Sequence, residues 1–476
     1  MTSRLICLLC LVLGLAATGD CFAVRHPHVL LVLLDDMGYG DAGCFNVGSK
    51  IATPSLDRLA REGLRFTDAH AAGPLCHPSR YGLMTGEFPV RTDVSVWPRQ
   101  PLIREGQVTV ASMLRSRGYR TAMVGKWHLG FAEEGYDRAL RGGPVDRGFE
   151  SFFGIRASTD IPPYFYIRGD RAVEPPSGRI GASSTDGWSP IQGAFWREGG
   201  IAPGLDLAEV LPRFTEEAEG VIRRHGAEAG EKPLFLYVAF PAPHTPWLPA
   251  EEDRGKSGAG LYGDFVVMVD RMVGRLLGAL DEAGMTDDTL VILTSDNGPV
   301  WYEADVERFG HDSAGGWRGM KGDAWEAGHR MPFIVRWPGR VKRGQVSRQM
   351  ICFTDVLATL AEVTGERLPE GQGRDSVSFL PVLLGDQPEG EAIRGPVVMQ
   401  SASGLMMVRS GPWKLIEGRG SGGFSGRGRS GGEDGPEGQL YHLGDDPGET
   451  LNYYEERGDV VGRLRVELRS VVEEER

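Results

Sequence analysis

The sequence has few cysteines, and half of them lie at its very start. Only six cysteines occur in 476 residues, and three of these fall within residues 1–23. The other three are Cys44, Cys76 and Cys352, too few for a disulfide framework. A Cys44–Cys352 bridge would leave Cys76 free, but nothing in the spacing requires that bridge. The sequence therefore leaves the pairing of Cys44 and Cys352 open.

Glycosylation sequons and basic stretches are also absent. The three asparagines are Asn46, Asn297 and Asn452, and none of them begins an Asn-x-Ser/Thr sequon. This pattern disfavours a glycosylated animal lysosomal protein and favours a bacterial secreted or periplasmic one. The formal net charge is −13 and no basic stripe is concentrated, which argues against a nucleic-acid partner.

Long apolar runs are missing except at the N-terminus. Residues 1–23 combine Arg4, an apolar run over 5–17 and the small Ala23, which predicts a signal peptide and a mature chain that begins near Val24. A lipid anchor at Cys21 is the alternative, although the preceding Asp20 suits it poorly. No other run approaches the roughly 20 apolar residues that span a bilayer, so we expect no membrane span and a secreted or periplasmic location.

Apolar runs of strand length alternate with helical patterns through most of the chain. They predict an α/β fold with a large, mostly parallel central sheet flanked by helices, and the buried strands are expected at residues 28–34, 119–124, 234–240 and 290–294. Four short strand candidates and a helix at 460–472 follow, which predicts a smaller C-terminal antiparallel sheet plus helix. We expect domains at 24–385 and 386–476, and long loops over 146–204 that govern substrate selectivity.

The segment from Cys76 to Gly86 predicts a short helix with a thiol just before its start. Pro78 suits a first helical position and Gly86 suits the end of the helix. Free backbone N–H groups there attract an anion, and Arg80 adds a permanent positive charge. The alternative is a small buried cysteine beside an ordinary helix.

Polar residues follow the predicted strands where each strand ends. They are Asp35 and Asp36, Lys126 and His128, His244, and Asp296 and Asn297. Each group alone could be a solvated turn, but parallel strands share one carboxyl edge, so we expect the groups to converge. The oxygen ligands Asp35, Asp36, Asp296 and Asn297 favour Ca²⁺ or Mg²⁺ over Zn²⁺. The basic residues Arg80, Lys126, His128, His244 and Lys321 would suit a tetrahedral oxyanion.

The Cys76-x-Pro-Ser-Arg segment, with Thr85-Gly86 behind it, resembles the signature of the type I, formylglycine-dependent sulfatases of the alkaline phosphatase superfamily. Over residues 24–476 the chain is similar to arylsulfatase-like members, in blocks at 35–40, 125–130, 243–246, 295–298 and 318–332. The resemblance implies a sulfuric ester hydrolase in which a maturation enzyme oxidises Cys76 to formylglycine. Asp35, Asp36, Asp296, Asn297 and residue 76 would hold Ca²⁺, with Mg²⁺ as the alternative.

The resemblance also implies roles for the remaining residues. Arg80, Lys126, His128, His244 and Lys321 would contact the sulfate or move protons, and Ser158 would contact the sulfate, although its loop departs from the family pattern. The substrate would be a sulfated small molecule or polysaccharide. Two alternatives stay open: a phosphate or phosphonate ester hydrolase on the same fold, and a protein that binds sulfated glycans without hydrolysing them.

Overall fold

Five buried strands form the parallel centre of a ten-stranded sheet. The computed structural model describes residues 26–97, 100–228, 232–388, 390–426 and 435–473, so the expected signal peptide lies outside the described residues. The central strands, in spatial order, are β11 (Thr289–Ser295), β1 (His28–Asp35), β10 (Leu234–Pro243), β4 (Arg120–Lys126) and β5 (Ser151–Ile155). All four strands expected from the apolar runs are present and mutually parallel. β5 was not expected, because it lies in the region assigned to loops.

Antiparallel strands extend this sheet at both edges. β12 (Phe333–Arg336) runs antiparallel to β11 and to β2 (Leu64–Phe66), and β13 (Gln345–Ser347) closes that edge. β6 (Ile167–Arg168) and β7 (Arg171–Ala172) close the other. Two small ribbons lie outside the sheet: β3 (Ala69–His70) with β14 (Ile351–Cys352), and β8 (Gly178–Ile180) with β9 (Gly199–Ile201). The sheet is therefore mixed, with its parallel part in the middle.

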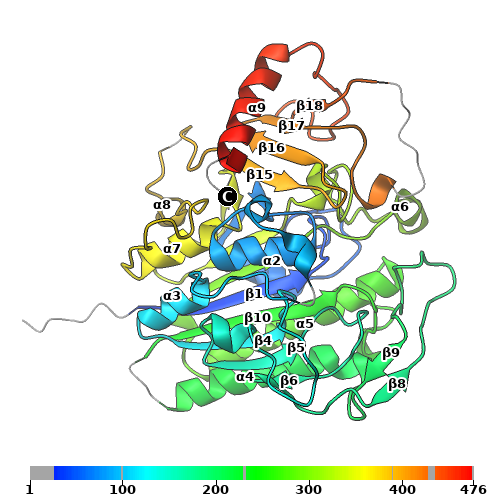
Figure 1. Cartoon of the computed structure of the whole chain (residues 1–476), viewed down its shortest axis with the longest axis vertical. Helices are drawn as coiled ribbons and strands as arrows, with labels where there is room; N and C mark the ends of the chain where they lie inside the picture. The colour runs from blue at the N-terminus through cyan, green and yellow to red at the C-terminus, as the bar shows by residue number, and fades with distance from the viewer. Residues whose placement is uncertain (1–25, 98–99, 229–231, 389, 427–434, 474–476) are drawn as a thin grey trace, which may run out of the picture.

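Helices cover both faces of the central strands. Figure 1 shows α2 (Cys76–Thr85), α3 (Val110–Ser116) and α7 (Asp355–Val363) on one face, and α4 (Val210–Ala227) and α5 (Gly260–Glu282) on the other. The remaining helices are α1 (Pro54–Glu62), which packs on α5 and β12, α6 (Glu303–Phe309), and α8 (Leu380–Leu384), which packs on α7. Within the described part of the chain, no helix is both long and apolar enough to cross a membrane.

The start of α1 is held by another helix. Thr53 precedes Pro54, the position expected for a capping side chain, but its hydroxyl accepts from Gly43 N instead. The backbone N–H groups of Ser55 and Leu56 donate to the carboxylate of Asp270 on α5, at 3.0 and 2.9 Å. A side chain distant in sequence thus performs the capping that Thr53 does not.

The C-terminal part forms the smaller antiparallel sheet that the sequence predicted. Its strands are β15 (Val397–Gln400), β16 (Met406–Ser410), β17 (Trp413–Ile416) and β18 (Gln439–His442), and α9 (Gly458–Glu473) packs against β16. Figure 1 shows this unit stacked at one end of the molecule beside the α2 layer. The limits 24–385 and 386–476 remain predictions. Cys44 and Cys352 are both free cysteines here, and Cys352 is buried.

Candidate active site

Four neighbouring strands end at one edge of the sheet, and polar residues follow each end. They are Asp35 and Asp36 at β1, Lys126 and His128 at β4, His244 at β10, and Asp296 and Asn297 at β11. The register pairs Leu34 with Ser295 and Asp35 with Pro243, so these ends lie level with one another. The structure therefore brings the predicted groups together, and all of them are buried.

Two of these residues adopt a backbone conformation that is unusual for any residue other than glycine. Asp36 has φ 63° and His128 has φ 58°. Left-handed conformations of this kind cost free energy and persist only where the surrounding structure enforces them. Both residues directly follow strand ends, where the turn directs their side chains toward the same site.

Cys76 lies at the first residue of α2, fully enclosed beside the carboxylates. The expected start of this helix was wrong by two residues. Pro78 occupies the third helical position, where a backbone N–H would also lack a partner within the helix. Gly86 ends the helix with φ 68°, as expected. The Cys76 Sγ lies 3.5 Å from Asp35 Oδ1 and 4.0 Å from Asp36 Oδ1. Burial, reinforced by the charge of Asp296, raises the pKa of this thiol well above its usual value.

Arg80, one turn further along α2, holds the carboxylates in place. Its Nε donates to Asp296 Oδ2 at 2.9 Å, its Nη2 to Asp35 Oδ2 at 3.2 Å, and its Nη1 to the Lys126 carbonyl at 2.9 Å. The Lys126 ammonium donates to the same Asp35 oxygen. Burial would raise the pKa of Asp35, but Lys126, His244 and Arg80 hold it well below its usual range. Asp35 is therefore an anion between cations.

Asp36 lies next to three further predicted residues, Lys321, Asn297 and His244. Lys321 Nζ donates to its two oxygens at 2.6 and 2.8 Å, and Asn297 Nδ2 donates to Oδ1 at 2.6 Å. His244 Nε2 lies 3.6 Å from Asp36 Oδ2. Because His244 Nδ1 lies 2.6 Å from the Thr245 carbonyl oxygen, it must carry the ring proton, which leaves Nε2 facing the site.

This donor set suits a hard divalent cation. One ligand atom each from Asp35, Asp36, Cys76 and His244 lies within 4.8 Å of the others. The side-chain oxygen of Asn297 is buried and has no hydrogen-bond partner among the described residues. A cation would satisfy that oxygen together with the two carboxylates. Asp296, by contrast, turns one oxygen toward Arg80, and His244 joins the cluster that the sequence had assigned to oxygen ligands alone.

The cluster forms the floor of a pocket with a volume of about 210 Å³. Of the predicted residues, the pocket is bordered by Asp36, Cys76, His128, Ser158, His244 and Lys321. Both ring nitrogens of His128 and the hydroxyl of Ser158 are buried without a hydrogen-bond partner in the described chain. Burial, with the charge of Lys126, holds the pKa of His128 well below its usual value, so its imidazole is neutral.

Sequence reasoning missed several residues of the pocket wall. Trp97, Asp160, Arg197 and Phe424 also border it. Asp160 and Arg197 lie in the loop region 146–204 expected to govern selectivity, whereas nothing in the local pattern distinguished Trp97 and Phe424.

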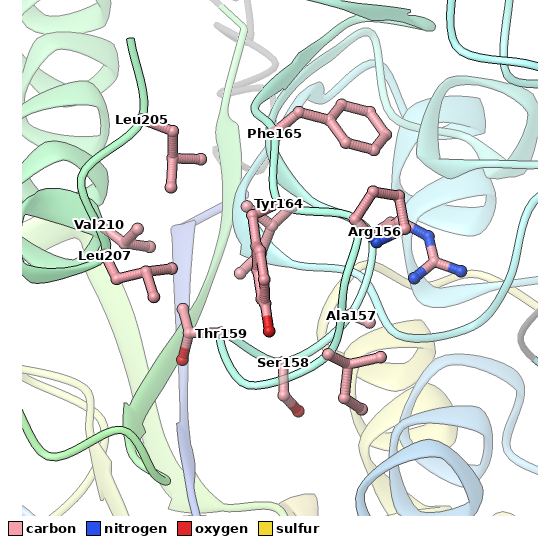
Figure 2. Close-up of a pocket in the computed structure, with 12 residues that line it drawn as sticks. Arg156, Ala157, Ser158, Thr159, Tyr164, Phe165, Leu205, Leu207 and Val210 are labelled. Atoms are coloured by element: carbon pink, nitrogen blue, oxygen red, sulfur yellow. The ribbon is translucent and has the colours of Figure 1, made fainter. Parts of the chain in front are cut away.

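The loop that carries Ser158 is firmly packed. A neighbouring cavity has a volume of only about 10 Å³. Figure 2 shows Leu205, Leu207 and Val210 on one side of Tyr164, with Arg156 and Ala157 on the other. Arg156 Nε donates to Glu133 Oε1 at 2.7 Å. This apolar support and buried ion pair fix the position of the loop at the pocket.

The fold and the site together define a class of protein: hydrolases that place a nucleophile, anionic oxygen ligands and cations at the carboxyl edge of a mixed α/β sheet. Comparison with known proteins specifies the family. The sequence model described as Sulfatase matches residues 27–366. The chain therefore belongs to the sulfatase family, whose members are sulfuric ester hydrolases.

Individual relatives agree with this assignment. An N-acetylgalactosamine-6-O-sulfatase of Bacteroides thetaiotaomicron is 32% identical, over 94% of this chain and 93% of that protein. Human arylsulfatase A is 34% identical, over 84% and 76% of the two chains. A solved structure from B. thetaiotaomicron, described with the metabolism of multiple glycosaminoglycans, has a TM-score of 0.80 at 30% identity and covers 94% of this chain and 99% of its own.

Proposed function

We propose that this protein hydrolyses sulfate esters of carbohydrates, using a formylglycine made from Cys76. One observation carries the proposal: Cys76 lies at the floor of a pocket, 3.5 Å from Asp35, with Lys321, His128 and His244 around it. A sulfate ester that enters this pocket meets the nucleophile and the protonatable groups together.

The modified residue and a cation would supply the chemistry that the side chains lack. Asp35, Asp36, Asp296 and Asn297, with residue 76, would hold Ca²⁺, with Mg²⁺ as the alternative. When present, a divalent cation would polarise oxygen, and a hydrated formylglycine would supply one hydroxyl as the nucleophile and a second, ionisable hydroxyl for the release of sulfate. A serine at the same position would have no second hydroxyl.

The residues around Cys76 have different roles in neutralising charge and moving protons. Lys321 is bound to Asp36 by two hydrogen bonds, so it stays beside the departing oxygen as a cation that neutralises developing charge. His244 presents Nε2 to the site and, when protonated there, delivers the proton to the leaving alcohol. His128 is neutral, with both nitrogens unused within the described chain, and accepts the proton from the second hydroxyl. Arg80 and Lys126 fix Asp35, and Ser158 donates to a sulfate oxygen.

A sulfated carbohydrate substrate is supported by the relatives, two of which are an N-acetylgalactosamine-6-O-sulfatase and an N-acetylgalactosamine-6-sulfatase. The signal-peptide pattern of residues 1–23 supports export to the periplasm or the medium, and a formylglycine-generating or equivalent enzyme would be the maturation partner.

Mass spectrometry of the peptide that carries residue 76, from protein made in its native host, tests the proposal directly. We expect a mass that corresponds to the aldehyde or its hydrate, and a Cys76→Ser variant without turnover. A peptide that carries only thiol, in active protein, would sink the formylglycine proposal.

Two further measurements test the substrate and the cation. Turnover of aryl sulfate should exceed turnover of aryl phosphate, and a panel of sulfated sugars should identify the preferred ester. Activity removed by a chelator should return with Ca²⁺ or Mg²⁺, and the more effective ion identifies the cofactor.

A further inference from the structure

Asp160 offers an unused hydrogen-bond acceptor to the pocket. It lies between β5 and β6, in the same loop as Ser158, and only 4% of its surface is exposed. Its Oδ1 has no hydrogen-bond partner among the residues that the structure describes. The nearest ring nitrogen, His244 Nδ1, is 3.9 Å away and faces the Thr245 carbonyl. A buried carboxylate oxygen without a donor is costly, so it favours a ligand that brings one.

The other carboxylate oxygen of Asp160, Oδ2, already accepts a hydrogen bond. Arg197 Nη1 donates to Asp160 Oδ2 at 2.5 Å and to the Asp160 carbonyl at 3.2 Å. The Tyr164 hydroxyl donates to the Arg197 carbonyl at 2.7 Å, and Ile161 N donates to the Ser158 carbonyl at 3.0 Å. These bonds fix the carboxylate, so Oδ1 keeps its position whether or not a ligand is bound.

Trp97 places an unused donor on the same pocket. Its indole Nε1 is buried and finds no acceptor within the described chain. The indole stacks on His77, with ring centroids 5.0 Å apart and planes 15° apart. The pocket thus offers both an acceptor and a donor beyond the residues that surround the sulfate.

We propose that Asp160 is a specificity-determining residue, whose Oδ1 accepts a hydrogen bond from a hydroxyl or N–H group of the sulfated sugar ring. This inference rests on the proposed function and deepens it. A sugar sulfate carries such a donor, whereas a simple aryl sulfate has none to offer. Asp160 therefore selects sulfated carbohydrates with a free ring donor over aryl sulfates.

The test compares two substrates of one enzyme. The kcat/KM of Asp160→Ala is measured with methylumbelliferyl sulfate and with the sulfated monosaccharide that the wild-type protein hydrolyses best. We expect a loss of about 10- to 100-fold on the sugar and less than about threefold on the aryl ester, since a hydrogen bond to a charged acceptor disappears only from the former. The pH profile with the aryl ester should stay unchanged, because Asp160 does not act through His244.

A deoxy analogue sharpens the comparison. A sugar sulfate that lacks the contacted hydroxyl should be a poor substrate of the wild-type protein, and Asp160→Ala should barely lower its turnover further. Asp170→Ala, at a partly exposed aspartate near β7, is the matched control and should leave both substrates within about twofold. If Asp160→Ala is unstable in a melting experiment, Asp160→Asn, which keeps the shape, replaces it and should show the same selective loss.

The following outcomes would contradict the proposal. Equal losses on both substrates, or a shifted pH profile with the aryl ester, would assign Asp160 to the fold or to His244 instead. An unchanged sugar turnover would show that Oδ1 meets no substrate donor. Wild-type protein with formylglycine that hydrolyses neither ester would contradict the proposed function itself, and this inference with it.

Discussion

Lys321 lies between the candidate ligand cluster and the pocket. Its ammonium lies 2.6 and 2.8 Å from the Asp36 oxygens while its side chain borders the pocket. We predict that Lys321→Ala lowers kcat for alkyl and sugar sulfates at least about tenfold more than for activated aryl sulfates, because poor leaving groups need the most help with developing charge. Rates across a series of leaving groups measure this, and Lys321→Arg, which keeps the charge, should lose less. Parallel losses across the series would place Lys321 away from the leaving oxygen.

At the scale of single residues, the sequence revealed the floor of the site better than its walls. Asp35, Asp36 and Asp296 follow long apolar strands, so the topology of a parallel sheet alone brought them to one edge. Trp97 and Arg197 come from irregular loops, whose paths depend on packing rather than on any periodicity. The unused oxygen of Asp160 became visible only once burial and hydrogen bonds were known.

The capping of α1 by α5 shows how elements distant in sequence hold one another. Asp270 accepts from Ser55 N and Leu56 N. We predict that Asp270→Ala lowers the free energy of unfolding by about 1–2 kcal/mol, since two buried N–H groups lose their acceptor. Urea denaturation at pH 7.5 measures the change. Asp287→Ala, at an exposed aspartate after α5, is the control and should change stability by less than about 0.5 kcal/mol. An equal effect of both substitutions would contradict the capping role.

A buried charge network joins the small sheet to the segment just before β12 of the main sheet. Lys414 on β17 lies 3.2 Å from Glu326 Oε1 and 2.9 Å from Glu449 Oε1, and its Nζ is 3.1 Å from His329 Nε2. All four side chains are buried. Two carboxylates from different parts of the chain therefore share a single ammonium.

Removing that ammonium should uncouple the two sheets. We predict that Lys414→Met lowers the free energy of unfolding by about 3–5 kcal/mol, because the carboxylates stay buried without a counter-charge. Equilibrium denaturation followed by tryptophan fluorescence measures it, with Lys342→Met at an exposed lysine as the matched control. Stability equal to that of the control would mean that the network contributes nothing to holding the sheets together.

At the scale of elements, the strands were easier to predict than the helices that cover them. The four buried strands end within three residues of their expected limits. α4 was not expected, although Val210, Phe214, Ala218 and Ile222 recur every four residues, and this spacing was the available signal. β5 could not be predicted because a five-residue strand among glycines and aromatic residues has no distinctive pattern.

The stability of the whole molecule should depend on pH through buried histidines remote from the pocket. Burial lowers the pKa of His70 and His329 below the usual value, and Lys414 adds to the effect on His329. Asp68, Glu326, Arg330 and Lys414 surround the pair. Below about pH 6.5 the unfolded chain protonates these imidazoles and the folded chain does not, so stability falls as the pH falls.

We therefore predict a lower free energy of unfolding at pH 5.5 than at pH 7.5, with a slope of up to about 1.4 kcal/mol per pH unit for each histidine. The depressed pKa of Asp68 and Glu326 affects stability only at more acidic pH. The raised pKa of Asp270, about 6, and the raised pKa of Glu449 oppose the trend toward pH 5.5. Denaturation curves across this range test the prediction, and His70→Gln should flatten the slope. Stability that rises toward pH 5.5 would refute the assignment of neutral histidines.

The order of strands in the central sheet also dictates when the protein can fold during synthesis. β1 pairs with β10 and β11, which follow it by roughly 200 and 260 residues, and Lys321 must still reach Asp36 after that. The earliest strand therefore leaves the ribosome long before either neighbour exists, with apolar side chains from Val29 to Leu34 on both faces. Contacts between residues this distant along the chain form slowly, and the strand edges stay unpaired until they form. Nascent chains that end before β11 should therefore depend on chaperones, and no partial translation product can possess the catalytic centre.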